Sequence, residues 1–293
     1  MRVLVTNDDG IGSAGLHAIA RHLEADGHDV LVVAPRDDMS GSSASIGRIP
    51  ENDLVDVTTV PIDGLSAPGR ALDGPPGLAV IAAMFGAFGD TPDVVVSGIN
   101  SGLNTGSLVL HSGTVGAALT AQNFGASALA VSLQPSDPWR WDTACGLAGD
   151  LVRWLADQAP ARTVLSLNVP ARSIDDVRGL RWSSLGAKGS VRVAAGDGHT
   201  GLQFEFHARE SEDGTAQVTG TADGTDEEAA TFPDGVSSCD DDLVLGGWAT
   251  VTALRGVTED KLSTDRPLPS RVERYVAPGP APTSNGADPD GRP

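Results

Sequence analysis

The apolar residues of the first 170 positions follow two alternating patterns. Short, almost wholly apolar runs predict five strands, at residues 2–6, 29–34, 93–96, 128–132 and 163–168. Between them, apolar residues recur every three or four positions, which predicts helices at 16–25, 76–88, 114–124 and 141–158. Apolar strands that alternate with helices indicate an α/β fold, with a doubly wound, mostly parallel sheet that is buried on both faces.

The pattern changes after residue 170. Helical spacing disappears, and four shorter runs predict strands at 180–183, 190–194, 202–207 and 250–254. The stretch 205–242 is dense in Asp and Glu; a solvated acidic loop is the simplest interpretation, and a partner-binding acidic patch is the alternative. The last segment, 277–293, is rich in Pro and Gly and predicts a disordered tail.

The charge of the chain limits its partners. It has 20 Lys and Arg against 39 Asp and Glu, a net charge of −19. Nucleic acids and anionic membranes are bound by basic surfaces, so we expect neither a nucleic-acid duplex nor a membrane as partner. A small anionic substrate remains compatible, because a bound divalent cation reverses the local field. With two cysteines, no apolar run long enough to span a bilayer and no N-terminal signal, we expect a cytoplasmic location.

The segment Asn7-Asp8-Asp9-Gly10 follows the first predicted strand, where ligands bind in parallel sheets. Two adjacent carboxylates repel each other unless a cation lies beside them, and Mg²⁺ and Mn²⁺ prefer oxygen ligands. The structural alternative is that one Asp caps the following helix. One Asp would be enough for that, and both lie several residues before the expected helix start, so a metal site is favoured.

The glycines that follow offer a second interpretation. Gly10, Gly12 and Gly15 have the G-x-G-x-x-G spacing of dinucleotide-binding loops, which would make the protein a non-catalytic nucleotide- or NAD-binding module. A pyrophosphate there would face Asp8 and Asp9 with no Lys or Arg in the loop. At ~4 Å and an effective dielectric constant of ~20, each like-charge pair costs on the order of 4 kcal/mol. The dinucleotide interpretation is therefore less favoured.

Two later segments also follow predicted strands. Segment 34–45 is rich in serine and either covers the surface or brings a hydroxyl group to the metal or the substrate. Segment 97–118 carries two Asn side chains, which can offer a carbonyl oxygen to a metal or an amide donor to a phosphate. It ends in Ser112-Gly113-Thr114 at a predicted helix N-terminus, which suits a phosphate, although simple capping is the alternative. His111 alone is ambiguous.

Four motifs, VTNDDGIGSAGL, SGSSAS, VVSGINSGLN and SGTVGAA, resemble in their order and roughly in their spacing those of the SurE family, stationary-phase survival proteins that act as metal-dependent 5′/3′-nucleotidases. The resemblance covers about residues 1–275. It implies a Rossmann-like domain with a smaller β-rich C-terminal part that takes part in dimers and tetramers. We therefore expect a catalytic core at 1–176, a β-rich oligomerisation extension at 177–276, a tail at 277–293, and a homodimer or homotetramer.

The resemblance also implies the site. One divalent cation per subunit, Mg²⁺ or Mn²⁺, would be held by Asp8, Asp9, Ser40 and Asn100. The substrate phosphate would be bound by Asn104, Ser112, Gly113 and Thr114. The catalytic residues would be Asp8, Asp9, Asn104 and Ser112. The expected reaction is hydrolysis of nucleoside 5′-monophosphates, with 3′-monophosphates as a further substrate class.

The general base of this reaction stays open at this point. One of the two aspartates is the first candidate and His111 the second. An aspartyl-phosphate intermediate on Asp8 or Asp9 is a less favoured alternative, because that chemistry usually places its carboxylates one residue apart. Residues 105–111 lack the acidic residues and the tyrosine of many family members, which leaves the substrate range open.

Overall fold

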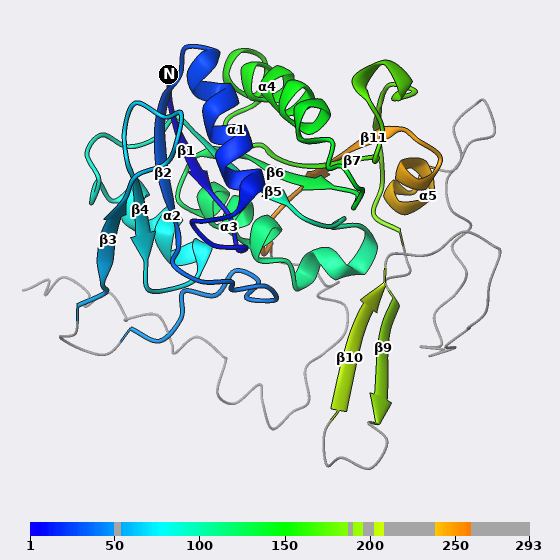
Figure 1. The fold of residues 1–293 in the computed structure, drawn as a ribbon, viewed down its shortest axis with the longest axis horizontal. Coiled ribbons are helices and arrows are strands. Elements are labelled where there is room, and N and C mark those ends of the chain that lie inside the picture. Colours follow the sequence, from blue (N-terminus) through cyan, green and yellow to red (C-terminus); the bar gives the residue numbers. More distant parts are fainter. Residues whose placement is uncertain (50–53, 187–189, 196–201, 208–237, 259–293) are drawn as a thin grey trace, which may run out of the picture. The chain divides into compact units, whose positions relative to one another are not determined.

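The computed structural model describes residues 1–49, 54–186, 190–195, 202–207 and 238–258 (Figure 1). The chain divides into two units, residues 1–256 and 257–293, and all described helices and strands belong to the first. The predicted tail 277–293 and most of the acidic stretch, 208–237, lie outside the described residues. No helix in the described part is long and apolar enough to cross a membrane.

A nine-stranded sheet forms the centre of the first unit, in the order β3-β4-β2-β1-β5-β6-β7-β11-β8. Its strands are β1 (Arg2–Thr6), β2 (Asp29–Pro35), β3 (Val57–Val60), β4 (Gly69–Leu72), β5 (Val94–Asn100), β6 (Ser127–Leu133), β7 (Val164–Val169), β8 (Leu180–Trp182) and β11 (Ala249–Leu254). All neighbouring pairs are parallel except β3 with β4 and β7 with β11. The predicted mostly parallel sheet is therefore confirmed.

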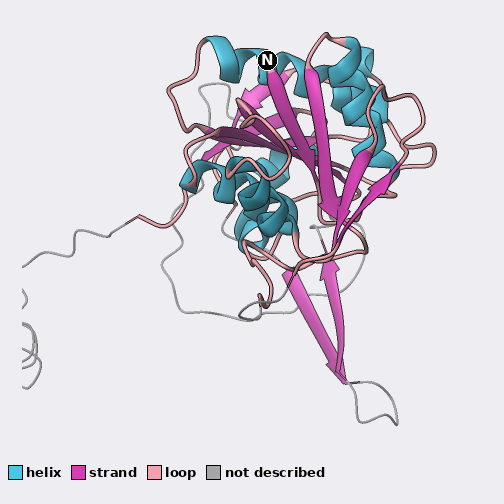
Figure 2. Cartoon of the chain, turned by 90° about the vertical axis from the view of Figure 1, so that its left-hand side faces the viewer, coloured by secondary structure: helices cyan, strands magenta, loops and turns pink. Residues whose placement is uncertain are grey.

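Helices cover both faces of this sheet, as Figure 2 shows. On one face α1 (Ala14–Ala25) packs with α4 (Trp141–Asp157), and on the other α2 (Pro76–Met84) packs with α3 (Gly113–Asn123). Successive residues of β1 alternate between the two layers: Val3 and Val5 belong to the first apolar core and Leu4 to the second. This double burial explains why the central strands are almost wholly apolar.

The sequence pattern missed three kinds of element. Strands β3 and β4 are only four residues long, and β3 is largely exposed, so neither has a long apolar run. The 3₁₀ helices η1 (Gly106–Leu110) and η2 (Ile174–Asp176), and the six-residue helix α5 (Asp240–Leu245), are too short for a periodic signal. The short helices lie below the length at which hydrophobic spacing identifies a helix, and β3 and β4 lack the apolar pattern of a strand.

The strands predicted after residue 170 all occur. Strands β9 (Ser190–Ala195) and β10 (Leu202–His207) form a separate antiparallel pair, whereas β8 and β11 extend the main sheet. The expected domain boundary at residue 176 coincides with the end of η2. The division into a core and an oligomerisation extension stays a prediction.

The order of the strands places the functional segments together. Strand β1 lies between β2 and β5, so the chain leaves the middle of the sheet in opposite directions on its two sides. Such a switch point opens a crevice beyond the carboxyl ends of the strands, where ligands bind in open α/β sheets. The segments after β1 and β5 both reach this edge.

Candidate active site

The loop after β1 is held in a tight turn that presents two carboxylates. Gly10 has a φ of +95°, and a Cβ built on it would lie 3.2 Å from the backbone carbon of Asp37, so the turn needs glycine. The Asn7 side chain donates to the Gly10 carbonyl at 3.1 Å and to Ser13 Oγ at 2.7 Å. Ser13 is the N-cap of α1, so the capping alternative for the two aspartates is wrong.

Asp8 lies directly against the N-terminus of α3. It is 4% exposed, and its Oδ1 accepts a hydrogen bond from the Thr114 hydroxyl. A Cβ built on Gly113 would lie 2.7 Å from both Cβ and Oδ2 of Asp8, so only glycine permits this approach. Ser112 caps α3, because its Oγ accepts the Val115 N–H at 3.1 Å. Ser112 is therefore a helix cap, as the structural alternative predicted, whereas the Thr114 hydroxyl donates to Asp8 and does not cap the helix.

The electrostatics of the aspartate pair suit a bound cation. Burial raises the pKa of Asp8, and the Thr114 hydroxyl and nearby backbone N–H groups oppose that rise. Burial, together with the charges of Asp8 and Asp38, raises the pKa of Asp9 to about 6. Asp9 Oδ2 is buried and has no hydrogen-bond partner among the described residues. A divalent cation would supply both a charge partner and a bond to that oxygen, so the residues present fit such an ion.

The other two expected metal ligands have different surroundings. Asn100 ends β5, and its Nδ2 donates to the Gly102 carbonyl at 2.8 Å, which leaves Oδ1 as the ligand atom. The N–H of the next residue, Ser101, acts on Asp9 and lowers its pKa against the larger effect of burial. Ser40 is exposed, and its hydroxyl donates to Asp38 Oδ1 at 2.6 Å. The structure thus brings the Asn100 segment to the aspartates but turns Ser40 toward Asp38.

The serine-rich segment 34–45 packs closely against α3 at two glycines of that helix. A Cβ on Gly116 would lie 2.1 Å from the carbonyl oxygen of Ser43, and one on Gly113 would lie 2.6 Å from Ser42 Oγ. The Met39 N–H also donates to the Asp8 carbonyl at 2.7 Å. Ser42 Oγ is buried without a partner in the described part of the chain. Sequence reasoning did not single out Ser42; the available signal was the spacing Gly113-x-x-Gly116, which leaves one helix face open.

Asn104 is fixed by two residues from neighbouring strands. Its N–H donates to Asn168 Oδ1 at 2.8 Å, and Asn168 Nδ2 returns a bond to the Asn104 carbonyl at 2.9 Å. The Asn104 side chain donates to Ser132 Oγ at 2.9 Å. Asn168 and Ser132, which end β7 and β6, were missed; fully buried polar residues at the ends of apolar strands were the signal. His111, the second candidate base, is exposed after η1.

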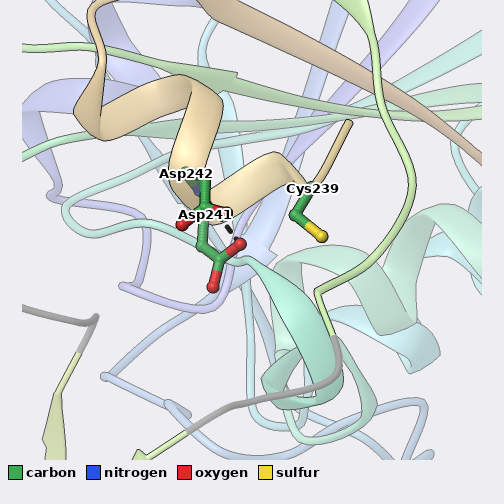
Figure 3. A group of neighbouring side chains, drawn as sticks. All are labelled: Cys239, Asp241 and Asp242. Carbon is green, nitrogen blue, oxygen red and sulfur yellow. Dashed lines mark hydrogen bonds between the residues drawn. The ribbon is translucent and has the colours of Figure 1, made fainter. Parts of the chain in front are cut away.

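Another group of possible metal ligands lies at the start of α5 (Figure 3). One ligand atom from each of Cys239, Asp241 and Asp242 lies within 4.8 Å of the others. Asp241 Oδ1 already accepts the Asp242 N–H at 3.0 Å, and acidic groups of this kind are common without an ion. We therefore assign no metal to it. Asp241 itself is buried, so this end of the acidic stretch is not a solvated loop, contrary to expectation.

The motifs after β1, β5 and at the start of α3 fall within the match to a known family model. The model described as survival protein SurE matches residues 3–191, more than half of the chain. The chain belongs to the SurE family. The resemblance expected from the four motifs is thereby confirmed, and the match includes every residue assigned to the SurE metal and phosphate sites.

Named SurE relatives and a solved SurE structure agree with this assignment. The chain is 41% identical over 189 residues to the 5′-nucleotidase SurE of Xanthomonas campestris pv. campestris strain B100, covering 64% of this chain and 70% of the relative. The 5′-nucleotidase SurE of Xanthomonas oryzae pv. oryzae strain PXO99A matches equally. The crystal structure of the SurE protein from Aquifex aeolicus superposes with a TM-score of 0.65 at 24% identity, covering 88% of this chain and 95% of that one. The latter likeness bears out the α/β fold.

Proposed function

We propose that this protein is a metal-dependent phosphomonoesterase that hydrolyses nucleoside 5′-monophosphates to nucleoside and phosphate, with 3′-monophosphates as a further substrate class. Its family and the name 5′-nucleotidase SurE of its relatives bear out the predicted hydrolase. The observation that carries the proposal is the pair of adjacent carboxylates at the switch point of the sheet, with Asp8 buried against the N-terminus of α3 and Asp9 Oδ2 buried without a partner in the described part of the chain. A carboxylate pair beside helix N–H groups can bind a cation and a phosphate together.

One divalent cation, Mg²⁺ or Mn²⁺, would be held by Asp8, Asp9 and Asn100. Ser40 would complete the set after its hydroxyl leaves Asp38, with which it now forms a hydrogen bond. When bound, such a cation neutralises phosphate charge and acts as a Lewis acid on the phosphoryl oxygens. The buried, unpartnered Asp9 Oδ2 and the raised pKa values of both aspartates support this ligand set.

The phosphate would be bound by groups of the chain itself. The backbone N–H groups of Gly113 and Thr114 lie at the positive end of α3 and interact with the Asp8 carboxylate in this structure. In the substrate complex they would turn to the phosphoryl oxygens and stabilise developing negative charge. The Asn104 side chain would donate from the opposite segment, and Ser112 would keep the first turn of α3 in place. We propose one of the two aspartates, Asp8 or Asp9, as the group that accepts the proton of the attacking water, with His111 as the alternative base.

The assembly and the location of the protein are part of the same proposal. We propose a homodimer or homotetramer formed through the extension 177–276, as the family resemblance implies. We also propose a cytoplasmic enzyme, because two cysteines in 293 residues are too few to stabilise a chain of this size by disulfides, which suits a reducing compartment.

A substrate panel tests the proposed reaction. Phosphate release from AMP, GMP, 3′-AMP and p-nitrophenyl phosphate would be measured with Mn²⁺, with Mg²⁺ and with excess EDTA. We expect release from the nucleotides only when a divalent cation is present. Calorimetric binding of NAD without metal, together with no phosphate release from any substrate, would instead support the non-catalytic nucleotide-binding module.

We expect the stabilisation of the protein by a bound metal to depend on pH, because the two aspartates must be ionised to bind it. The pKa of Asp9, about 6 in the folded protein, lies above its ordinary value of 3.8. Its protonated form therefore stabilises the metal-free protein below about pH 4, and this contribution is lost as the pH rises through about 6. A cation binds the ionised carboxylates, so the increase in Tm caused by Mn²⁺ should be small near pH 5 and larger near pH 7.5.

Scanning fluorimetry with Mn²⁺ and with EDTA measures this effect. The Asp9→Asn variant is the control, because removal of the titrating carboxyl should flatten the pH dependence of the metal-free Tm. An equal Mn²⁺-induced rise in Tm at both pH values would contradict the assignment of the cation to ionised Asp8 and Asp9.

A further inference from the structure

Asp240 is a fully buried carboxylate at the first position of α5. It lies beyond residue 191, where the match to the SurE family model ends. Its carboxylate accepts three backbone N–H groups: Gly106 at 3.2 and 3.1 Å from Oδ1 and Oδ2, Gly186 at 2.9 Å, and Asp241 at 3.0 Å. A buried carboxylate is tolerated only when such donors compensate its lost hydration, so these bonds join three separate segments at one side chain.

Gly106 connects this carboxylate to the proposed phosphate site. It is buried at the start of η1, has a φ of +57°, and lies two residues after Asn104. The Gly106–Asp240 bonds join residues 134 positions apart. Asn104 itself is held by a reciprocal pair of hydrogen bonds with Asn168. The short stretch 104–106 is therefore anchored at both ends, by β7 on one side and by α5 on the other.

Only one of the three N–H donors, that of Gly106, lies next to the proposed phosphate site. The bonds from Gly186 and Asp241 would be sufficient to fix α5 on the segment that precedes β9. The bonds from Gly106 add a connection to the loop that carries Asn104. A residue that served only to hold α5 would not need this third connection.

We propose that Asp240 is a positioning residue for the phosphate site: by accepting the Gly106 N–H, it holds Asn104 where its side chain can bind the substrate phosphate. This rests on the proposed function and deepens it. The metal ligands Asp8, Asp9 and Asn100 all precede Asn104, so Asp240 should affect the binding of phosphate and leave the binding of metal unchanged. A segment after the family match thereby completes a site whose other residues come from the first half of the chain.

Substitutions of Asp240 separate these two kinds of binding. The Asp240→Ala variant should raise KM for AMP and the inhibition constant of inorganic phosphate by about 10- to 100-fold, the range for residues that orient a ligating group indirectly. The dissociation constant of Mn²⁺, measured by calorimetry, should stay within about twofold. Asp240→Asn keeps Oδ1 for all three N–H groups but replaces the Oδ2 that lies 3.1 Å from the Gly106 nitrogen with a donor, so it should recover only part of the loss. Asp242→Asn, an exposed position of α5, is the matched control.

A double-mutant cycle with Asn104 decides between positioning and a purely structural role. If Asp240 acts through Asn104, the variant that combines Asn104→Ala with Asp240→Ala should have the KM and inhibition constant of Asn104→Ala alone. If Asp240→Ala does not fold, the same cycle is run with Asp240→Asn. Additive effects, or a parallel loss of Mn²⁺ affinity, would overturn the positioning role. A wild-type protein without turnover would contradict the proposed function itself, and is thus a distinct outcome.

Discussion

Asp8→Asn should lower kcat/KM for AMP by on the order of 100-fold or more, because it removes one of two charges that hold the cation and replaces it with a neutral amide. The variant should fold, since Asn keeps an oxygen that can accept the Thr114 hydroxyl. The shape of the buried side chain is also kept. The measurement is phosphate release with Mn²⁺ at saturating and limiting AMP, together with the affinity for Mn²⁺.

Asp90→Asn is the control for this substitution. It makes the same chemical change at an exposed carboxylate that precedes β5, at the opposite edge of the sheet from the candidate site. Its kcat/KM should equal that of the wild type. An Asp8→Asn variant that kept most of its turnover would show that the metal site lies elsewhere.

Gly113→Ala should produce the second large loss. The added Cβ would lie 2.6 Å from Ser42 Oγ and 2.7 Å from Asp8 Oδ2, so both side chains must move. A displacement of about 1 Å in such a site lowers activity by about 100-fold. Overpacking should also lower the free energy of unfolding by roughly 1–3 kcal/mol. Enzyme kinetics and urea unfolding measure the two effects.

Gly146→Ala is the matched control, because no heavy atom lies within 4 Å of a Cβ built there. Gly146 lies inside α4, where alanine should raise the free energy of unfolding by roughly 0.5–1 kcal/mol and leave activity unchanged. If the kcat/KM of Gly113→Ala stayed within about twofold of wild type, the close approach of Asp8 to α3 would have no part in the reaction.

The sequence was sufficient to predict the sheet and its main helices, because burial on both faces imposes long apolar strands and regular helical spacing. It also singled out Asp8 and Asp9 as the proposed metal ligands, since adjacent carboxylates after a strand favour cation binding over helix capping or dinucleotide binding. The contact between Asp8 and Thr114 could be expected from a parallel sheet, because the segments that follow β1 and β5 both lie at the carboxyl ends of the strands.

The hydrogen-bond partners in other parts of the site could not be predicted from the sequence. Asn168 and Asp240 hold the stretch 104–106 through hydrogen bonds to backbone groups 64 and 134 positions away, and such pairings depend on the tertiary structure alone. The orientation of Ser40 toward Asp38 is set by a two-residue turn, which composition does not reveal. The start of α5 resembled a solvated acidic run because the burial of Asp240 and Asp241 follows from tertiary packing, including the contacts of α5 with β11, and not from their own spacing.

The position of β11 between β7 and β8 has a consequence for the synthesis of the protein. Strands β1 to β7 and helices α1 to α4 are complete by residue 169, so their parallel sheet can form while the chain is still on the ribosome. Asp8 and Asp9 would then already meet α3, but Gly106 would lack its carboxylate acceptor until α5 follows. The newly made chain should therefore acquire its capacity for metal before its capacity for phosphate.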